Sequence, residues 1–87
     1  MKTKSIQFNF SKKNVLIVGG SRGFGAALVS NFVKSNANVY YISRNLNTNK
    51  EGSHISVDLS DTKDLLLALE KIKKIKIDIL INCAAIN

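Results

Sequence analysis

The stretch VLIVGGSRGFG (residues 15–25) decides the fold that we predict for this chain. It opens with four apolar residues, VLIV, a run typical of a β-strand that is buried on both faces. Three glycines follow in the spacing G-x-x-x-G-x-G, at Gly19, Gly23 and Gly25. Apolar residues then recur at three- and four-residue spacing, which predicts a helix over residues 23–35. The stretch is therefore predicted to be a strand, a glycine-rich turn and the start of a helix.

Two further strands are predicted after this helix. Residues 38–42 (NVYYI) are β-branched and aromatic, which favours a strand. Residues 43–53 are rich in Asn, Thr, Gly and charged side chains and predict a loop. Residues 54–57 then predict a short third strand.

A second helix and a fourth strand complete the pattern. The segment Asp58-Leu-Ser60-Asp61 offers side chains that cap the N-terminus of a helix. The helix is predicted to present one apolar face and to end in a lysine-rich turn, and that face comprises Leu65, Leu66, Leu69 and Ile72. Residues 75–85 (IKIDILINCAA) predict a fourth strand and the start of the loop that follows it.

The predicted order is β-α-β-loop-β-α-β, and such alternation implies a parallel sheet with right-handed crossovers. We predict an α/β fold, a Rossmann-like doubly wound parallel sheet with strand order 3-2-1-4, in which residues 1–87 form one partial domain. The fourth strand then lies at an open edge, with Ile77, Ile79 and Ile81 on one side and Leu80 on the other. An uncharged edge favours pairing, so we expect a fragment of a longer chain or self-association through this strand.

Composition narrows the class of protein. The 87 residues are 45% hydrophobic and 22% charged, which is ordinary for a globular protein. No apolar run reaches about 18 residues, so we expect no transmembrane helix. The single cysteine, Cys83, fits a reducing, cytoplasmic compartment.

The net charge of +7 suits a phosphorylated ligand, nucleic acid or an anionic membrane surface. The lysine clusters contain no interleaved aromatic residues, and no helix-turn-helix, zinc-finger or RNA-recognition signature is present. We therefore favour a solvated lysine-rich surface over nucleic-acid binding. A basic protein that binds a polyanion stays an alternative.

The glycine-rich turn predicts a site for an anion. A turn onto a helix N-terminus presents backbone N–H groups and the positive end of the helix dipole. Glycines allow positive φ angles and let the backbone approach a pyrophosphate closely. The turn is not a P-loop, because no Lys-Ser/Thr pair follows Gly25.

Three stretches together carry a family resemblance. VGGSRGFG resembles the T-G-x-x-x-G-x-G fingerprint of the short-chain dehydrogenase/reductase family, with Val18 in place of the usual threonine. VDLS, which contains Asp58, and ILINCAA, which is similar to the N-N-A-G segment of the family, follow in the same order. The resemblance spans residues 10–87. It implies a nicotinamide dinucleotide cofactor and hydride transfer to or from a small carbonyl or alcohol substrate.

The resemblance also assigns residues to the cofactor. Asp58 would meet the adenine, and residues 82–85, among them Asn82 and Ala84, would border the ribose. Cys83 and Ala85 depart from N-N-A-G, and a thiol cannot supply the hydrogen bonds of an amide. We expect Cys83 to be a small buried hydrophobe. The residues that would line the pyrophosphate are Gly19, Ser21, Gly23, Phe24 and Gly25.

The end of the second predicted strand discriminates between the two nicotinamide cofactors. An acidic residue there binds the free ribose 2′-hydroxyl, whereas an arginine accommodates a 2′-phosphate. This chain has Ser43-Arg44-Asn45, with no Asp or Glu between residues 39 and 49. Arg22, in the glycine turn, is a second guanidinium for the same phosphate. We predict NADP(H) in preference to NAD(H).

Catalytic residues are not predicted in this chain. The family resemblance implies a serine and a Y-x-x-x-K pair, but the two tyrosines, Tyr40 and Tyr41, are followed four residues later by Arg44 and Asn45. We interpret both tyrosines as packing residues. His54 has no partner at ligand spacing, so we predict a structural role and no metal site. An alternative function is a non-catalytic module that binds or senses NAD(P).

Overall fold

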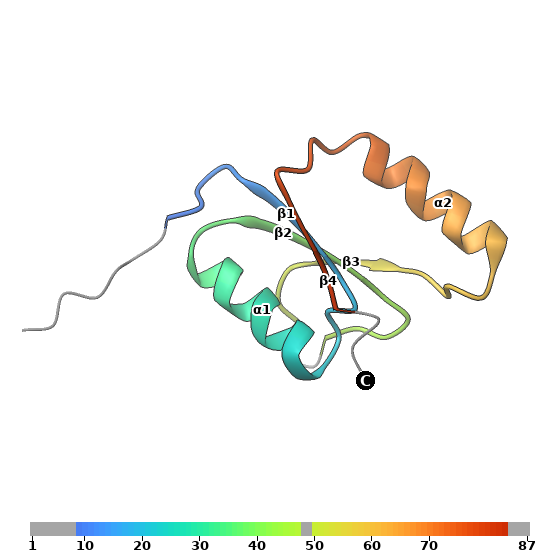
Figure 1. Cartoon of the computed structure of the whole chain (residues 1–87), viewed down its shortest axis with the longest axis horizontal. Coiled ribbons are helices and arrows are strands. Elements are labelled where there is room, and N and C mark those ends of the chain that lie inside the picture. The colour runs from blue at the N-terminus through green and yellow to red at the C-terminus, as the bar shows by residue number, and fades with distance from the viewer. Residues whose placement is uncertain (1–8, 48–49, 84–87) are drawn as a thin grey trace, which may run out of the picture.

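The four strands form one parallel sheet. The structure is a computed structural model that describes residues 9–47 and 50–83. The strand order is β3-β2-β1-β4 (Figure 1), as predicted. The elements are β1 (Asn14–Val18), α1 (Gly23–Lys34), β2 (Asn38–Ser43), β3 (Ser53–Ser56), α2 (Thr62–Lys73) and β4 (Ile79–Asn82).

Strand β1 lies at the centre and is buried on both faces. It pairs in parallel with β2 on one side and with β4 on the other. Alternate side chains point to opposite faces, so Val15 and Ile17 join a core beneath α1, whereas Leu16 joins a core on the α2 side. The continuous apolar run therefore reflects a strand between two layers of helix.

Helix α1 packs against the sheet more extensively than α2 does. Val29 is fully buried against β1 and β2, and Leu28 and Phe32 pack around it. The helix ends at Lys34, where the N–H of Ser35 donates to the carbonyl groups of Asn31 and Phe32. It thus follows the predicted range within one residue.

Helix α2 begins as predicted, but only part of its predicted apolar face packs against the sheet. Asp61 caps it by accepting hydrogen bonds from the N–H groups of Lys63 and Asp64. Ala68 is the buried residue, with Ile72 partly buried beside it. Of the predicted apolar face, Ile72 packs into the α2-side core, whereas the leucines of the helix are exposed: Leu65, Leu66, Leu67 and Leu69.

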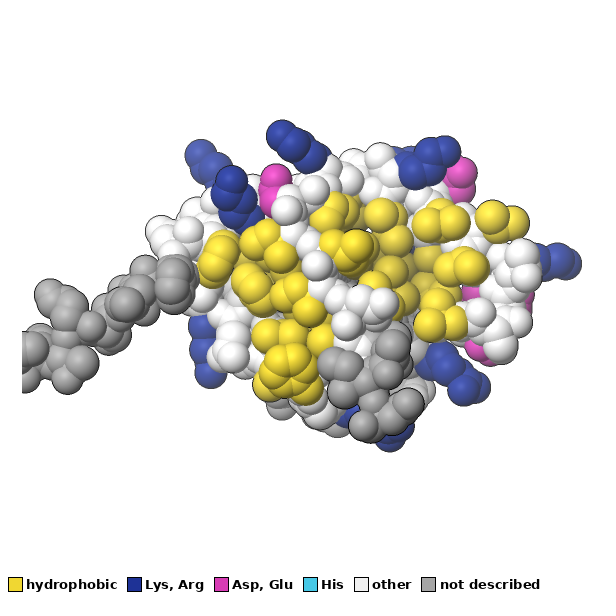
Figure 2. All heavy atoms as spheres, viewed as in Figure 1, with side chains coloured by type: hydrophobic (Ala, Val, Ile, Leu, Met, Phe, Trp, Pro, Cys, Tyr) yellow, Lys and Arg dark blue, Asp and Glu magenta, His cyan; other side chains and the backbone are white. Residues whose placement is uncertain are grey.

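Strand β4 is shorter than residues 75–85 and forms the open edge of the sheet. Ile79 and Ile81 pack on the α1 side, and Leu80 is exposed on the other face. Ile77 precedes the strand and packs into the α2-side core, so its predicted side of the sheet is wrong. Figure 2 shows apolar side chains gathered over β4 and between the two helices.

Among residues 9–47 and 50–83, neither helix has the length and apolar character needed to cross a bilayer.

Candidate nucleotide-binding site

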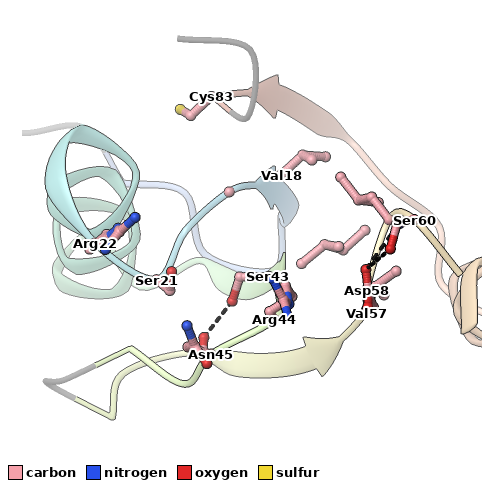
Figure 3. A pocket seen from close by; sticks show the side chains of 13 residues that line it. Val18, Ser21, Arg22, Ser43, Arg44, Asn45, Val57, Asp58, Ser60 and Cys83 are labelled. Carbon is pink, nitrogen blue, oxygen red and sulfur yellow. Dashed lines mark hydrogen bonds between the residues drawn. The ribbon is translucent and has the colours of Figure 1, made fainter. Parts of the chain in front are cut away.

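A cleft of about 580 Å³ lies at the carboxyl ends of the four strands. In parallel α/β sheets this edge is where ligands bind, because the loops that leave the strands converge there. Figure 3 shows residues after β1, β2, β3 and β4 surrounding the same space. The lining comprises Val18, Gly19, Ser21, Arg22, Ile42, Ser43, Arg44, Asn45, Val57, Asp58, Leu59, Ser60 and Cys83.

The glycine turn forms one wall of this cleft. Gly19 has a φ of 89° and Gly23 a φ of 63°, values in the left-handed region that favours glycine. The N–H of Gly19 donates to the carbonyl of Ile42 over 2.7 Å, which ties the turn to the end of β2. The turn therefore has the backbone freedom that the sequence pattern predicts.

Close approach explains two further glycines. A Cβ on Gly25 would lie 2.0 Å from the carbonyl oxygen of Gly19, so α1 begins in direct contact with the turn. A Cβ on Gly20 would lie 2.7 Å from the Cβ of Tyr41. The turn and the first residues of α1 thus fit together only without side chains at these positions.

The N-terminus of α1 carries features of an anion site. Arg22 precedes the helix and makes no side-chain capping bond, and the first turn contains no acidic residue. The positive end of the helix dipole therefore faces the cleft without a protein carboxylate to neutralise it. Such an end favours a phosphate.

The turn after β2 forms the opposite wall. Ser43 ends the strand, and its hydroxyl donates to the carbonyl of Asn45 over 2.5 Å. Arg44 lies between them, exposed to solvent and lining the cleft (Figure 3). This arrangement places Arg44, which carries a guanidinium, in the lining of the same cleft as the glycine turn.

Asp58 lines the cleft after β3. Its Oδ1 accepts hydrogen bonds from the Ser60 hydroxyl over 2.6 Å and from the Ser60 N–H over 3.0 Å. These bonds hold the pKa of Asp58 below its ordinary value of 3.8, and the positive charge of Arg44 lowers it further. Asp58 is therefore ionised at neutral pH.

Comparison with known proteins adds the decisive observation. The family model described as short chain dehydrogenase matches residues 13–87. The chain belongs to this family.

A solved structure supports the same assignment. A short-chain dehydrogenase from Leptospira borgpetersenii serovar Hardjo-bovis (strain JB197), crystallised with bound NAD⁺, superposes with a TM-score of 0.72 at 34% identity. The match covers 99% of this chain and 36% of that chain. The chain thus spans about a third of this short-chain dehydrogenase.

A curated relative matches over a shorter stretch. The "Cyclic-di-GMP-binding biofilm dispersal mediator protein" of Escherichia coli (strain K12) is 59% identical over 32 residues. This stretch is 37% of the present chain and 14% of that protein.

The structure brings together part of the predicted short-chain dehydrogenase site. Six predicted residues line the cleft, namely Gly19, Ser21, Arg22, Ser43, Arg44 and Asp58. Gly23 and Gly25 lie at the start of α1, and Phe24 is exposed there. Asn82 ends β4, and Ala84 lies outside the described residues. Their contacts with a cofactor stay predictions.

Other lining residues were not predicted. Val18, Ile42, Val57 and Leu59 give the cleft an apolar part, and Asn45 and Ser60 add polar groups. The sequence feature that could have identified them is their position, because each lies at or just after the carboxyl end of a parallel strand. Cys83 is buried, as expected, and it lines the cleft within the segment 82–85 that the resemblance places at the ribose.

Tyrosine and histidine side chains have packing roles in this part of the family fold. Tyr41 is fully buried, Tyr40 packs against the α2-side core, and His54 stacks on Tyr41 with ring centroids 4.8 Å apart. None of the three lines the cleft. The described residues contain no cluster of His, Cys, Asp and Glu that could hold a metal ion.

The lowered pKa of Asp58 predicts a pH-dependent contribution to stability. A carboxyl whose pKa is lower in the folded state stabilises the fold above its unfolded value and loses this effect in acid. We expect Asp58→Asn to lower the free energy of unfolding at neutral pH, and the difference from wild type to shrink below about pH 4. Urea denaturation at a series of pH values measures this difference. A difference in the free energy of unfolding that stays constant through the acid range would contradict the assignment. When Ser60→Ala has removed the hydroxyl donor, the effect of Asp58→Asn at neutral pH should be smaller.

Proposed function

We propose that this chain is the NADP(H)-binding part of a short-chain dehydrogenase/reductase. The observation that carries the proposal is one cleft that holds both the glycine turn and Arg44. The bound NAD⁺ of the Leptospira relative supports a nicotinamide dinucleotide. The choice of NADP(H) over NAD(H) rests on the residues of this chain.

The described residues fit a dinucleotide phosphate. Gly25 lies against the Gly19 carbonyl with no room for a side chain, so backbone atoms form this part of the turn. The start of α1 has no side-chain cap and offers its N–H groups to a pyrophosphate. Arg22 and Arg44 offer guanidinium groups to a 2′-phosphate. Asp58 offsets only part of this positive charge, because one carboxylate faces two guanidinium-bearing residues in the lining of the cleft.

The chemistry of the proposal comes from the cofactor. A bound nicotinamide supplies or accepts a hydride, and a small carbonyl or alcohol compound is the other reactant. We assign to residues 1–87 the work of a partial dinucleotide-binding domain: to bind the cofactor and orient it. We assign them no catalytic residue, and we place the protein in the cytoplasm.

Titration of the purified chain with NADPH and NADH tests the proposal. We expect saturable binding of both, with a lower dissociation constant for NADPH, measured by calorimetry. A folded chain that binds neither cofactor would contradict the proposal. Equal affinity for the two would contradict the cofactor choice alone.

A second candidate function is binding without reduction. The curated relative is named as a protein that binds cyclic di-GMP, and that ligand also presents phosphates and purine bases to a protein. In this alternative the same cleft holds a cyclic dinucleotide as a signal. A competition experiment separates the two candidate functions. If cyclic di-GMP displaces bound NADPH at a lower concentration than NADH does, the result favours the second function.

We also propose that the β4 edge associates with further polypeptide. Leu80 is 63% exposed on an edge strand, and apolar surface of this kind favours pairing. Leu80→Lys should raise the concentration at which the chain self-associates by about tenfold or more, because burial of a leucine contributes about 1.5–3 kcal/mol. Sedimentation at several concentrations measures this effect. Leu46→Lys, at an exposed leucine outside β4 and α2, is the matched control, and an equal effect there would contradict the role of the edge.

A further inference from the structure

A buried asparagine connects the two walls of the cleft. Asn47 follows the turn after β2 and is 1% exposed. Its backbone N–H donates to the Tyr41 hydroxyl over 2.7 Å, and its side-chain amide donates to the Gly20 carbonyl over 3.4 Å. These two hydrogen bonds hold the segment after Arg44 against both β2 and the glycine turn.

His54 holds the same turn from the other side. Its Nε2 lies 2.9 Å from the Ser43 carbonyl oxygen and 3.0 Å from the Ser43 hydroxyl. A carbonyl only accepts, so Nε2 carries the proton and donates it. The Ser43 hydroxyl is then free to donate to the Asn45 carbonyl, the bond drawn in Figure 3.

The contacts of Asn47 and those of His54 meet at Tyr41 in the core. Tyr41 and His54 are paired across β2 and β3, and their rings stack at an interplanar angle of 21°. Tyr41 is fully buried, so the hydroxyl that accepts the Asn47 N–H has a fixed position. One continuous set of contacts thus runs from Gly20 to Asn45.

We propose that Tyr41, Asn47 and His54, called here the support network, position Arg44 and so set the preference for NADP(H). The inference rests on the proposed function. None of the three lines the cleft, so each acts through the turn and none contacts the cofactor. The support network contacts Ser43, which precedes Arg44, through His54, and the Ser43 hydroxyl in turn donates to the carbonyl of Asn45, which follows Arg44.

The physical reason is the geometry that recognition of a phosphate requires. An arginine binds phosphate best through two parallel N–H bonds, and this arrangement needs the guanidinium at a defined distance and angle. Arg44 is exposed, so packing around its side chain does not restrict it. Its backbone is the part that the protein can fix. His54 holds Ser43 directly before Arg44, and Asn47, three residues after it, is held to Tyr41 and to Gly20 of the glycine turn.

Two substitutions at one position separate the hydrogen bond from the ring. His54→Phe keeps a flat ring against Tyr41 but loses the N–H donor, whereas His54→Gln keeps a donor without the ring. Loss of one hydrogen bond corresponds to a factor of about 2 to 12. We therefore expect His54→Phe to lower the NADPH-over-NADH preference by about threefold to tenfold, through weaker NADPH binding, and His54→Gln to keep it within about twofold of wild type.

Titration with NADPH and NADH, after circular dichroism has confirmed folding, measures these ratios. Tyr41→Phe keeps the ring, removes only the acceptor for the Asn47 N–H and should lower the preference in the same way. If His54→Phe does not fold, the Tyr41→Phe variant tests the inference in its place.

The outcomes separate this inference from the proposed function. A wild-type preference for NADPH that Arg44→Ala removes, but that both His54→Phe and Tyr41→Phe retain, would overturn the positioning role alone. Equal weakening of NADPH and NADH in these variants would also overturn it, because a merely structural role predicts that result. A wild-type chain that binds both cofactors without any preference would overturn this inference and the choice of NADP(H), but not the binding of a nicotinamide dinucleotide.

Discussion

Replacement of Gly25 with alanine is expected to leave little folded protein. The new Cβ would lie 2.0 Å from the carbonyl oxygen of Gly19, far inside any real contact. That oxygen belongs to the backbone of the glycine turn, so relief requires the start of α1 to move away from β1. Overpacking of this kind costs about 3 kcal/mol or more, and a core in a domain of this size supplies only about 3–5 kcal/mol.

Gly23→Ala is the matched comparison. A Cβ at Gly23 meets nothing within 4 Å, so its cost comes from the positive φ of 63° alone, about 1–2 kcal/mol. Urea denaturation followed by circular dichroism should therefore rank wild type, Gly23→Ala and Gly25→Ala in falling stability. Equal stability of the two variants would show that the contact between Gly25 and Gly19 is not a constraint on the fold.

Arg44→Asp is expected to reverse the proposed cofactor preference. Loss of a charge-assisted hydrogen bond to the 2′-phosphate costs about 1.5–3 kcal/mol, which raises the NADPH dissociation constant by about 10- to 150-fold. The new carboxylate repels that phosphate but can accept a hydrogen bond from the free ribose 2′-hydroxyl of NADH. We therefore expect NADH affinity to hold or improve while NADPH affinity falls.

Two controls separate recognition from general electrostatics. Lys50→Asp makes the same change of charge at an exposed residue that does not line the cleft, and it should change NADPH affinity much less. Arg44→Ala should lower NADPH affinity without improving NADH. Equal losses in Arg44→Asp and Lys50→Asp would show that net charge, and not Arg44, determines the affinity for NADPH.

Local sequence patterns predicted most of the framework correctly. The VLIV run, the glycine turn and the periodic residues of α1 are contiguous in sequence, and each pattern reports on its own element. Alternation of strands and helices then determined the parallel sheet and its order, because right-handed crossovers leave few other arrangements.

The candidate site was partly predictable for the same reason. The glycine turn, Arg44 and Asp58 each follow a predicted strand, and parallel strands end at one edge. The support network was not predictable. Asn47 lies in a polar stretch typical of an exposed loop, and only its contacts with Tyr41 and Gly20 account for its burial.

The sequence by itself determined which segments form strands and helices and how they are ordered in the sheet. Tertiary structure alone decided which residues of the apolar face of α2 are buried and on which side Ile77 lies. Periodicity records that a face is apolar, but burial depends on which neighbours pack against it. Ala68 and Ile72 of α2 pack with Leu16, Ile42, Ile55 and Val57 in the α2-side core, whereas the leucines around Ala68 lie outside this core and are exposed.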